Sequence, residues 1–476
     1  MSYNLKNGKG QNMLDHDAGF FERFGTVAPE AQDRYVTDWS RDLTGRARVV
    51  VRPRSTDEVA AIVRHCSQHG LAVVPQGGHT GLVGGATPSA EGQEVVISLE
   101  RLDRVREIDA ENFTMSVEAG CILETVHAAA AAANRLFPLQ LSAQGSCQIG
   151  GNIATNAGGL NVVRYGMTRD LVLGVEAVLP DGQVWNGLRK LRKNNTGYDL
   201  KQLFLGSEGT LGIVTAACLK LFPRPTQVET AFLAVDSPTA AVALFGRARQ
   251  DLSDLLSAFE LLPRRGVELG LTAAPQARDP LAAPSPFYVL MEVAASGLLD
   301  LKALVERFLE GIVEDGLVRD GALATSGAQA AAFWQIREGL IEAQARQGRH
   351  LRTDVSIPIS GLAAFLDRTY ARLAEAAPDC VPLAYGHLGD GNIHFNVLPP
   401  AGLDDAGRLA VLHGCEEVIF AEVDAAGGSI SAEHGIGRVK RSAFLARTPP
   451  LDLDLLRKIK SALDPAGLMS PGRIFA

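Results

Sequence analysis

Two histidines in the C-terminal third of the chain are spaced so that they could bind one metal ion. His387 and His394 flank the turn residues Gly-Asp-Gly-Asn in the segment 385–397, YGHLGDGNIHFNV. Such a turn between apolar and aromatic positions predicts a β-hairpin, and if Leu388 faces Ile393 across it, His387 faces His394. Opposed residues on one sheet face have Cβ atoms about 4.5–5.5 Å apart, close enough for two imidazoles to share an ion.

Glu433 is a candidate for a third ligand. It precedes His434 in the segment 429–437, SISAEHGIG, where two titratable residues stand among small and apolar ones. Three protein ligands leave one coordination position open to a substrate, as catalysis requires. Zinc suits the nitrogen ligands, with manganese and cobalt as alternatives. Taken singly, each histidine would more often be a hydrogen-bonded core or loop residue.

Three glycine-rich stretches, 76–85, 145–159 and 206–214, lie within 140 residues of one another. Glycine loops let backbone N–H groups converge on phosphate oxygens because no Cβ blocks the approach, so a nucleotide pyrophosphate is the natural ligand. Tight turns between strands would explain any one stretch, but not three. Neither GxGxxG nor GxxxxGK[ST] occurs in these loops, which disfavours a Rossmann site and a P-loop.

The sequence predicts secondary structure most clearly in the residues before the first glycine stretch. Ser55 and Glu58 form a capping box ahead of apolar residues at helical spacing, and Gly70 ends that helix. A buried strand over 71–74 then leads into the loop. Further elements are expected as strands over 94–99, 113–118, 172–179 and 183–185 and as a helix over 122–134.

The composition is that of a large globular enzyme. At 476 residues the chain exceeds the roughly 250–300 at which single cores stop growing, so we expect two or more domains, with a boundary near residue 224. A net charge of −8 without a Lys/Arg run argues against a nucleic-acid partner. The six cysteines are scattered, which argues against a disulfide framework. Segment 1–17 is polar and the chain has no apolar run of 18 residues, so we expect a cytoplasmic protein and not an integral membrane protein.

Residues 75–85, PQGGHTGLVGG, and 149–159, IGGNIATNAGG, resemble the FAD pyrophosphate loops of the vanillyl-alcohol-oxidase flavin fold. Within that fold the chain is most similar to the D-2-hydroxyacid dehydrogenases, from about Tyr35 onwards. The resemblance implies an α+β protein with a two-lobed FAD-binding domain over 1–224 and a cap domain with an antiparallel sheet over 225–425. A C-terminal helical segment over 426–476 would return to the FAD domain.

The resemblance also implies that the glycine stretches and the residues around them hold FAD. The expected contacts are Pro75, Gln76, Gly77, Gly78, His79, Thr80, Gly81, Leu82, Ser146, Gly150, Gly151, Thr155, Asn156, Gly158, Gly159, Ile213 and Val214. At position 79 the family usually has Asn, whereas berberine-bridge-type flavoproteins attach FAD covalently through a His after two glycines. His79 therefore supports two hypotheses, a covalent flavin link or, more simply, a hydrogen bond near the cofactor.

The family supplies roles for the substrate site. His434 matches its general base, and chemistry agrees, because a neutral imidazole can take the proton of an alcohol polarised by a metal. Asn396 matches a substrate contact on the same strand face as a metal ligand, and Arg337 an arginine that clamps the substrate carboxylate. Arg352 stands where hydroxyglutarate enzymes carry Lys, and Ile341 where they carry Thr, so hydroxyglutarate, lactate and malate all stay open as substrates.

The expected reaction is oxidation of a D-2-hydroxy acid to its 2-oxo acid. The carboxylate would dock on Arg337, the metal-bound hydroxyl would lose its proton to His434, and hydride would pass to the flavin. An electron-transfer flavoprotein or a quinone would reoxidise the flavin, and a homodimer is expected because two-fold assemblies are common. The alternatives are a metal-dependent hydrolase, a non-redox FAD transferase resembling alkylglycerone-phosphate synthase, and, less favoured, a nucleotide-binding regulator.

Overall fold

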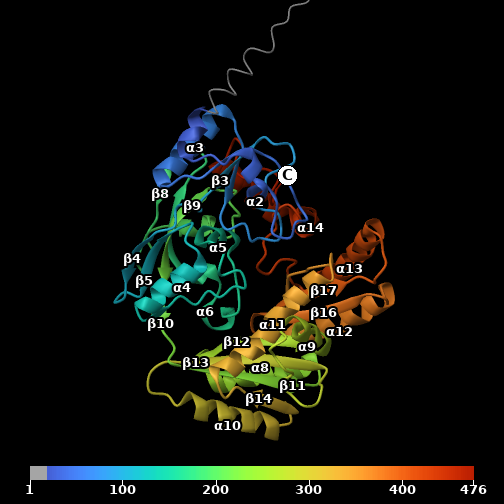
Figure 1. Ribbon diagram of the computed structural model, residues 1–476. Coiled ribbons are helices and arrows are strands. Elements are labelled where there is room, and N and C mark those ends of the chain that lie inside the picture. The colour runs from blue at the N-terminus through green and yellow to red at the C-terminus, as the bar shows by residue number, and fades with distance from the viewer. Residues whose placement is uncertain (1–18, 476) are drawn as a thin grey trace, which may run out of the picture.

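The computed structural model describes residues 19–475, which form two bodies (Figure 1). The first body opens with a parallel sheet of three strands, in the order β1 (Ala47–Val51), β3 (Glu94–Ser98), β2 (Val73–Gln76). Helix α3 (Thr56–His69) begins after Ser55, whose hydroxyl accepts the N–H of Glu58 at 3.2 Å, and ends at Gly70 with φ +64°. The predicted helix, its cap and its stop are confirmed.

An antiparallel sheet of five strands makes the second lobe of the first body. Its order is β4 (Val105–Asp109), β5 (Thr114–Glu118), β9 (Ile213–Lys220), β7 (Val172–Val178), β8 (Val184–Asn186). The expected alanine-rich helix is α4 (Leu123–Ala132). The stretch 149–159, expected as a loop, begins instead as helix α5 (Ile149–Thr155), whose C-terminal cap is Asn156 in the left-handed conformation.

Shorter elements complete the first body. They are η1 (Glu22–Phe24), η2 (Pro29–Ala31), α2 (Asp33–Val36), α6 (Val162–Tyr165), α7 (Thr168–Leu171), η3 (Leu200–Leu203) and the paired strands β6 (Arg135–Leu136) and β10 (Phe222–Pro223).

The second body is built on an antiparallel sheet of seven strands. Its order is β14 (Asp320–Leu323), β11 (Gln227–Val235), β13 (Phe287–Ala295), β12 (Leu256–Pro263), β16 (Val381–His387), β17 (Asn392–Leu398), β15 (Val355–Ser356). One face packs on α8 (Pro238–Leu252), α10 (Leu301–Glu314), α12 (Ile359–Ala376) and α13 (Asp405–Ala425), and the other on α9 (Arg264–Ala273) and α11 (Gly327–Arg346). The antiparallel cap sheet expected from the family resemblance is present.

Strand β12 is buried along its whole length because helices cover both faces of this sheet. Phe259 and Leu261 join the core on one face, and Leu262 joins the core on the face covered by α11. The period of two places Glu260 on the α11 face. A charged residue therefore lies in the middle of an apolar sheet.

The C-terminal segment crosses back to the first body. Ser431 forms a bridge with Asp354 of the second body, and short helices α14 (Arg441–Arg447) and α15 (Pro450–Leu463) follow. Met469 then pairs with Val73 beside the parallel sheet, where the red end of the ribbon lies near β3 (Figure 1). Arg473 forms a buried ion pair with Glu94.

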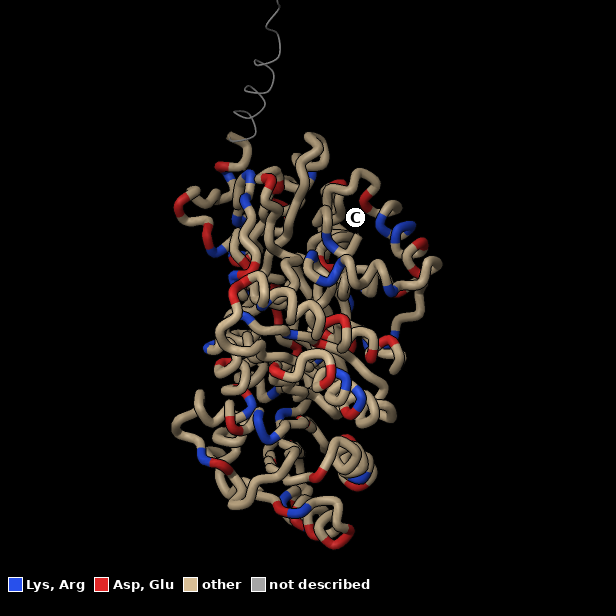
Figure 2. The backbone as a smooth tube through the Cα atoms, turned by 90° about the vertical axis from the view of Figure 1, so that its right-hand side faces the viewer, with Lys and Arg blue, Asp and Glu red and all other residues tan. Residues whose placement is uncertain are grey.

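Acidic and basic residues occur in both described bodies. Blue and red segments are interspersed over both bodies in Figure 2, so no broad surface of one sign is visible from that side. Within residues 19–475, no helix is long and apolar enough to cross a membrane.

We expect Arg473→Leu to destabilise the first body, because it leaves the Glu94 carboxylate buried without its partner. Breaking a buried pair in this way costs about 3–5 kcal/mol, which should lower the thermal midpoint by several degrees. The measurement is a thermal melt of the FAD-loaded protein. Lys458→Met, which removes an exposed pair with Asp454, is the control and should melt like the parent. Equal midpoints for both variants would contradict the assignment.

Candidate active site

A cleft in the first body, called here the glycine cleft, is lined by the glycine-rich stretches. The expected FAD contacts on its wall are Pro75, Gln76, Gly77, Gly78, His79, Thr80, Gly81, Gly150, Gly151, Thr155, Ile213 and Val214. A Cβ on Gly78 would lie 2.1 Å from the carbonyl oxygen of Ser146, and one on Gly77 would lie 3.3 Å from the nitrogen of Gly151. Glycine thus lets two backbones meet and form a cradle suited to phosphate.

The other five expected contacts lie off this wall. Leu82 and Gly159 line the adjoining histidine cavity defined below, and Ser146 lines a second cleft that continues from the first. Asn156 and Gly158 line none of the three. The first serves as the C-cap of α5, and the second packs against the carboxylate of the third ligand candidate.

The second cleft runs past residues 76–79 to Arg34, Tyr35 and Glu100. Gln148 lines both clefts, and its Oε1 is buried without a hydrogen-bond partner among the described residues. An unsatisfied buried acceptor costs about 1–3 kcal/mol, so a donor from a polar ligand is expected there. The two clefts together make an elongated site, and the residues present fit FAD.

Both ring nitrogens of His79 have hydrogen-bond partners. Nδ1 lies 3.1 Å from the carbonyl oxygen of Arg34, and Nε2 lies 3.0 Å from the hydroxyl of Thr87. Burial lowers the pKa of His79, which favours the neutral imidazole. A covalent flavin link through either nitrogen would cost one of these contacts, so the geometry favours the hydrogen-bonding hypothesis.

The predicted histidine hairpin is present, but the predicted register is wrong. Strands β16 and β17 pair Tyr385, not His387, with His394, because Leu388–Asp390 form a 3₁₀ turn that shifts the pairing by two residues. His387 lies opposite Glu260 of β12 instead. The two histidines are diagonal neighbours, which aromatic side chains can still bridge, and their ring centroids are 5.5 Å apart.

The three metal-ligand candidates nevertheless converge. One ligand atom each of His387, His394 and Glu433 lies within 4.8 Å of the others, which gives two nitrogens and one oxygen. Oε2 of Glu433 also accepts the N–H of Gly159 at 2.9 Å, which ties this group to the first body. The donor set fits zinc, manganese or cobalt.

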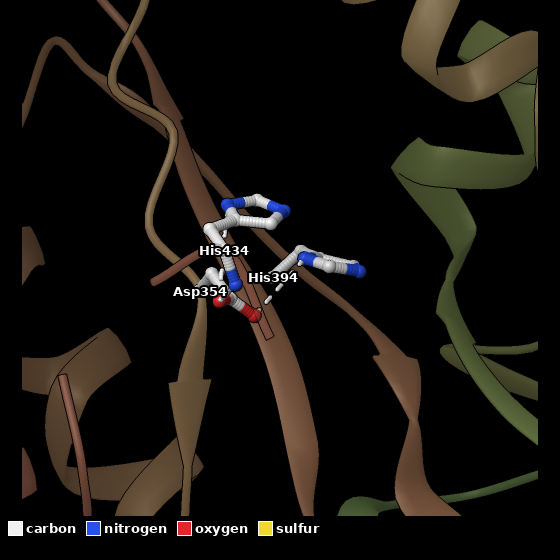
Figure 3. A group of neighbouring side chains, drawn as sticks. All are labelled: Asp354, His394 and His434. Atoms are coloured by element: carbon white, nitrogen blue, oxygen red, sulfur yellow. Dashed lines mark hydrogen bonds and ion pairs between the residues drawn. The ribbon is translucent and has the colours of Figure 1, made fainter. Parts of the chain in front are cut away.

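Asp354, His394 and His434 form a second group of potential ligands (Figure 3). The Asp354 carboxylate is fully buried and already engaged: Oδ2 accepts the N–H groups of residues 432–434 at 2.9–3.1 Å, and Oδ1 accepts Asn392 Nδ2 at 2.8 Å. With its oxygens occupied in this way, Asp354 suits a supporting role better than metal ligation.

Asp354 instead orients the histidines. Burial opposes its charge, but nearby cationic groups and the N–H donors hold the pKa of Asp354 well below its usual range. Nδ1 of His394 lies 3.9 Å from Oδ1, and Nδ1 of His434 lies 3.8 Å from Oδ2. In both rings the other nitrogen is on the opposite edge from this anion. Burial also lowers the pKa of His394 well below its ordinary value, which favours the neutral form that binds metals.

Glu260 orients His387 in the way that Asp354 orients the other two histidines. It is hydrogen-bonded to Nδ1 of His387, and its Oε2 accepts Nε–H of Arg337 at 2.7 Å. Burial opposes ionisation, but these two cationic partners lower the pKa of Glu260 to about 2. Burial likewise disfavours the charged imidazole, yet the Glu260 anion raises the pKa of His387 to about 9. A metal bound at Nε2 would therefore displace one proton from His387.

The histidine cavity, which adjoins the glycine cleft, contains the three ligand candidates. His434 lines both spaces. Helix α11 contributes Trp334, Arg337, Glu338 and Ile341, whose spacing of three and four residues places them on one helix face. The cavity thus has one arginine close to the metal-ligand candidates and a histidine facing the glycine cleft.

Arg337 lines this cavity, whereas Asn396 and Arg352 do not. Among described residues, Arg337 makes its hydrogen bond through Nε alone and stacks 5.0 Å from the ring centroid of Tyr385. Asn396 lies behind Tyr385, whose hydroxyl accepts its Nδ2 at 3.1 Å. Arg352 pairs with Asp42 at 3.2 Å and lines a neighbouring cavity that shares His434.

Sequence reasoning missed three carboxylates that hold this site. Glu260 had one signal, a lone charge inside the apolar run LSAFELLP of residues 256–263. No spacing pattern in the sequence pointed to Asp354 or Glu208. Glu208, from the third glycine stretch, accepts the N–H groups of residues 436 and 437 at 2.8 and 2.7 Å.

Comparisons with known proteins agree with this arrangement. Residues 47–187 match a family model described as FAD binding domain, and residues 224–474 match FAD linked oxidases, C-terminal domain. The mitochondrial D-2-hydroxyglutarate dehydrogenase of Bos taurus is 41% identical over 448 residues, covering 93% of this chain and 79% of that protein. The D-2-hydroxyglutarate dehydrogenase of Xanthomonas citri pv. viticola is 41% identical over 447 residues, covering 94% and 93%.

A solved alkyldihydroxyacetonephosphate synthase superposes with a TM-score of 0.73 over 99% of this chain and 86% of its own, at 17% identity. That likeness shows the fold alone. The chain belongs to the FAD-linked oxidases of the vanillyl-alcohol-oxidase fold. Within this family it is an FAD-dependent D-2-hydroxyacid dehydrogenase. Its similarity to these dehydrogenases argues against the hydrolase, transferase and regulator alternatives. The names of these two dehydrogenases specify no metal, electron acceptor or oligomeric state, so those expectations stay predictions.

We expect acid precipitation to release the flavin into the supernatant, because both nitrogens of His79 are engaged within the protein. The measurement is the flavin absorbance of supernatant and pellet after precipitation and centrifugation. Yellow colour that stays with the washed pellet would show a covalent link and contradict the hydrogen-bonding hypothesis.

Proposed function

We propose that the protein oxidises a D-2-hydroxy acid to the 2-oxo acid with FAD and a divalent metal, and passes the electrons to a separate carrier. The observation that carries the proposal is the place of His434, which lines the glycine cleft and the histidine cavity together. A proton acceptor at that junction would face both a substrate and the cofactor that oxidises it.

When bound, FAD would supply the hydride acceptor, and a divalent metal held by His387, His394 and Glu433 would polarise the substrate hydroxyl. The chain itself supplies the binding and the proton transfer. Three protein ligands converge among the described residues, which would leave a coordination position for a substrate oxygen.

Arg337 would bind the substrate carboxylate. Its Nε is held by Glu260 and its plane rests on Tyr385, so the two Nη groups are free of hydrogen bonds within the described chain and available for a bidentate contact. Burial raises the strength of this contact, because little water competes for the charge.

His434 would take the hydroxyl proton. Asp354 faces its Nδ1 at 3.8 Å and favours a proton on that nitrogen, so the other nitrogen keeps its lone pair. The same carboxylate accepts the backbone N–H of His434, which fixes the residue at the junction of the two spaces. The imidazolium formed in the reaction would be stabilised by the Asp354 anion.

D-2-hydroxyglutarate is the first substrate to test, because the two dehydrogenases compared above are named for it. Two features support a shorter or less polar side chain instead. Ile341 stands on the cavity wall, and Arg352 is paired with Asp42 outside it, so D-lactate and D-malate belong in the same panel. An electron-transfer flavoprotein or a quinone is the proposed acceptor.

The test is an anaerobic titration of the FAD-loaded protein followed at about 450 nm, before and after chelation. We expect one D-acid of the panel to bleach the flavin, its L-enantiomer to leave it unchanged, and chelation to abolish bleaching until Zn²⁺, Mn²⁺ or Co²⁺ is restored. Bleaching that survives complete metal removal would exclude the metal role. A yellow protein that no hydroxy acid bleaches would exclude the reaction.

We expect His434→Ala to lower kcat by a factor of about 10²–10⁴ while leaving FAD bound, because the substitution removes the base and little of the glycine cleft. Turnover and the ratio of flavin to protein absorbance are measured together. His413→Ala, which removes a histidine 71% exposed at its side chain on α13, is the control. Undiminished turnover in the His434 variant would rule it out as the base.

A further inference from the structure

A single carboxylate, Glu260, touches both a metal-ligand candidate and the arginine that faces the substrate. Its side chain is 0% exposed, on a strand whose eight residues are all buried. An ion costs several kcal/mol to remove from water, and a well-packed apolar residue would often serve stability as well or better. The presence of an anion here therefore calls for a role besides packing.

We propose that Glu260 is a positioning residue that fixes the tautomer of His387 and the orientation of Arg337 at the same time. The inference rests on the proposed metal and substrate roles of those two residues. Each oxygen of the carboxylate serves a different partner, Oε1 the imidazole and Oε2 the guanidinium. The sheet register fixes the point of attachment, because Glu260 lies directly opposite His387 across β12 and β16.

The tautomer follows from the chemistry of the hydrogen bond. A carboxylate can only accept, so it places the proton of a neutral imidazole on Nδ1. Nε2 of His387 is then the nitrogen with the free lone pair, on the opposite edge of the ring from Glu260. Carboxylates that hold metal-binding histidines in this way raise the basicity of the ligand as well as orienting it.

The orientation of Arg337 follows from its use of Nε. With Nε bound to Glu260 and the guanidinium 5.0 Å from the Tyr385 ring centroid, the plane of the group is held at two points. Its Nη groups keep the fork that matches a carboxylate. Glu260 thus holds both the metal-ligand candidate His387 and the proposed carboxylate-binding Arg337. A substrate with its hydroxyl and carboxylate on adjacent carbons needs these two groups at a fixed separation.

Glu260→Gln tests this directly, because an amide offers one acceptor oxygen where the carboxylate offers two. The variant cannot accept from both His387 and Arg337, and its NH₂ meets a donor on one side. We expect Zn²⁺ affinity of the metal-free protein to fall 10–100-fold, measured by competition with a chromophoric chelator. At saturating Zn²⁺, we expect KM for the hydroxy acid to rise about tenfold or more.

Two further variants separate positioning from stability. Glu260→Asp keeps two acceptor oxygens and should recover part of both losses. Glu422→Gln is the matched control, since Glu422 is another buried carboxylate of the second body with two cationic partners, Arg368 and Arg372, and lines none of the cavities described above. Its Zn²⁺ affinity and KM should equal those of the parent.

The inference is overturned if Glu260→Gln melts at a lower temperature but keeps Zn²⁺ affinity and KM within twofold of the parent, because the pair would then be structural only. If the Gln variant does not fold, Glu260→Asp is judged by the same criterion. A parent that binds none of Zn²⁺, Mn²⁺ and Co²⁺ overturns the proposed metal function instead. In that case a raised KM supports the Arg337 half of the inference, and an unchanged KM overturns it.

Discussion

Two carboxylates, one from each body, hold the loop on which the site depends. Asp354 of the second body accepts the N–H groups of residues 432–434, and Glu208 of the first body accepts those of residues 436 and 437. The loop carries one ligand candidate and the candidate base, and Glu208 also lines the glycine cleft. Because the loop is bonded to both bodies, the cleft in one and the histidines of the other keep a fixed relation.

The acids that hold the site differ in how their charge is compensated. Asp354 and Glu260 have cationic and N–H partners, which lower their pKa despite complete burial. Glu208 has mainly two backbone donors, so desolvation prevails and raises its pKa. Asp354 and Glu260 therefore stay ionised beside the metal-ligand candidates, whereas the carboxyl group of Glu208 at the junction of the two bodies is easier to protonate. Pairing, more than depth of burial, decides the charge at each position.

Local patterns in the sequence were enough for the parts of the site that lie on continuous segments. The helix after Ser55, the glycine stretches and the histidine hairpin all follow from short-range rules. The predicted register is wrong because glycine, aspartate and asparagine suit a hairpin turn over 389–392 as well as the 3₁₀ turn that Leu388–Asp390 form. Glu260 stayed hidden because it meets His387 across 127 residues of sequence, through a sheet order that no local pattern encodes.

The return of the chain to its first sheet has a consequence for biosynthesis. The Arg473 guanidinium that neutralises Glu94 is 379 residues further along the chain. At about 5–20 residues per second, a ribosome needs roughly 20–75 s to make that stretch. Throughout that interval the parallel sheet is exposed on the side that residues 468–473 later cover. The edge of the first sheet is therefore completed by a segment from the far end of the same chain, and long-range contacts of this kind slow folding.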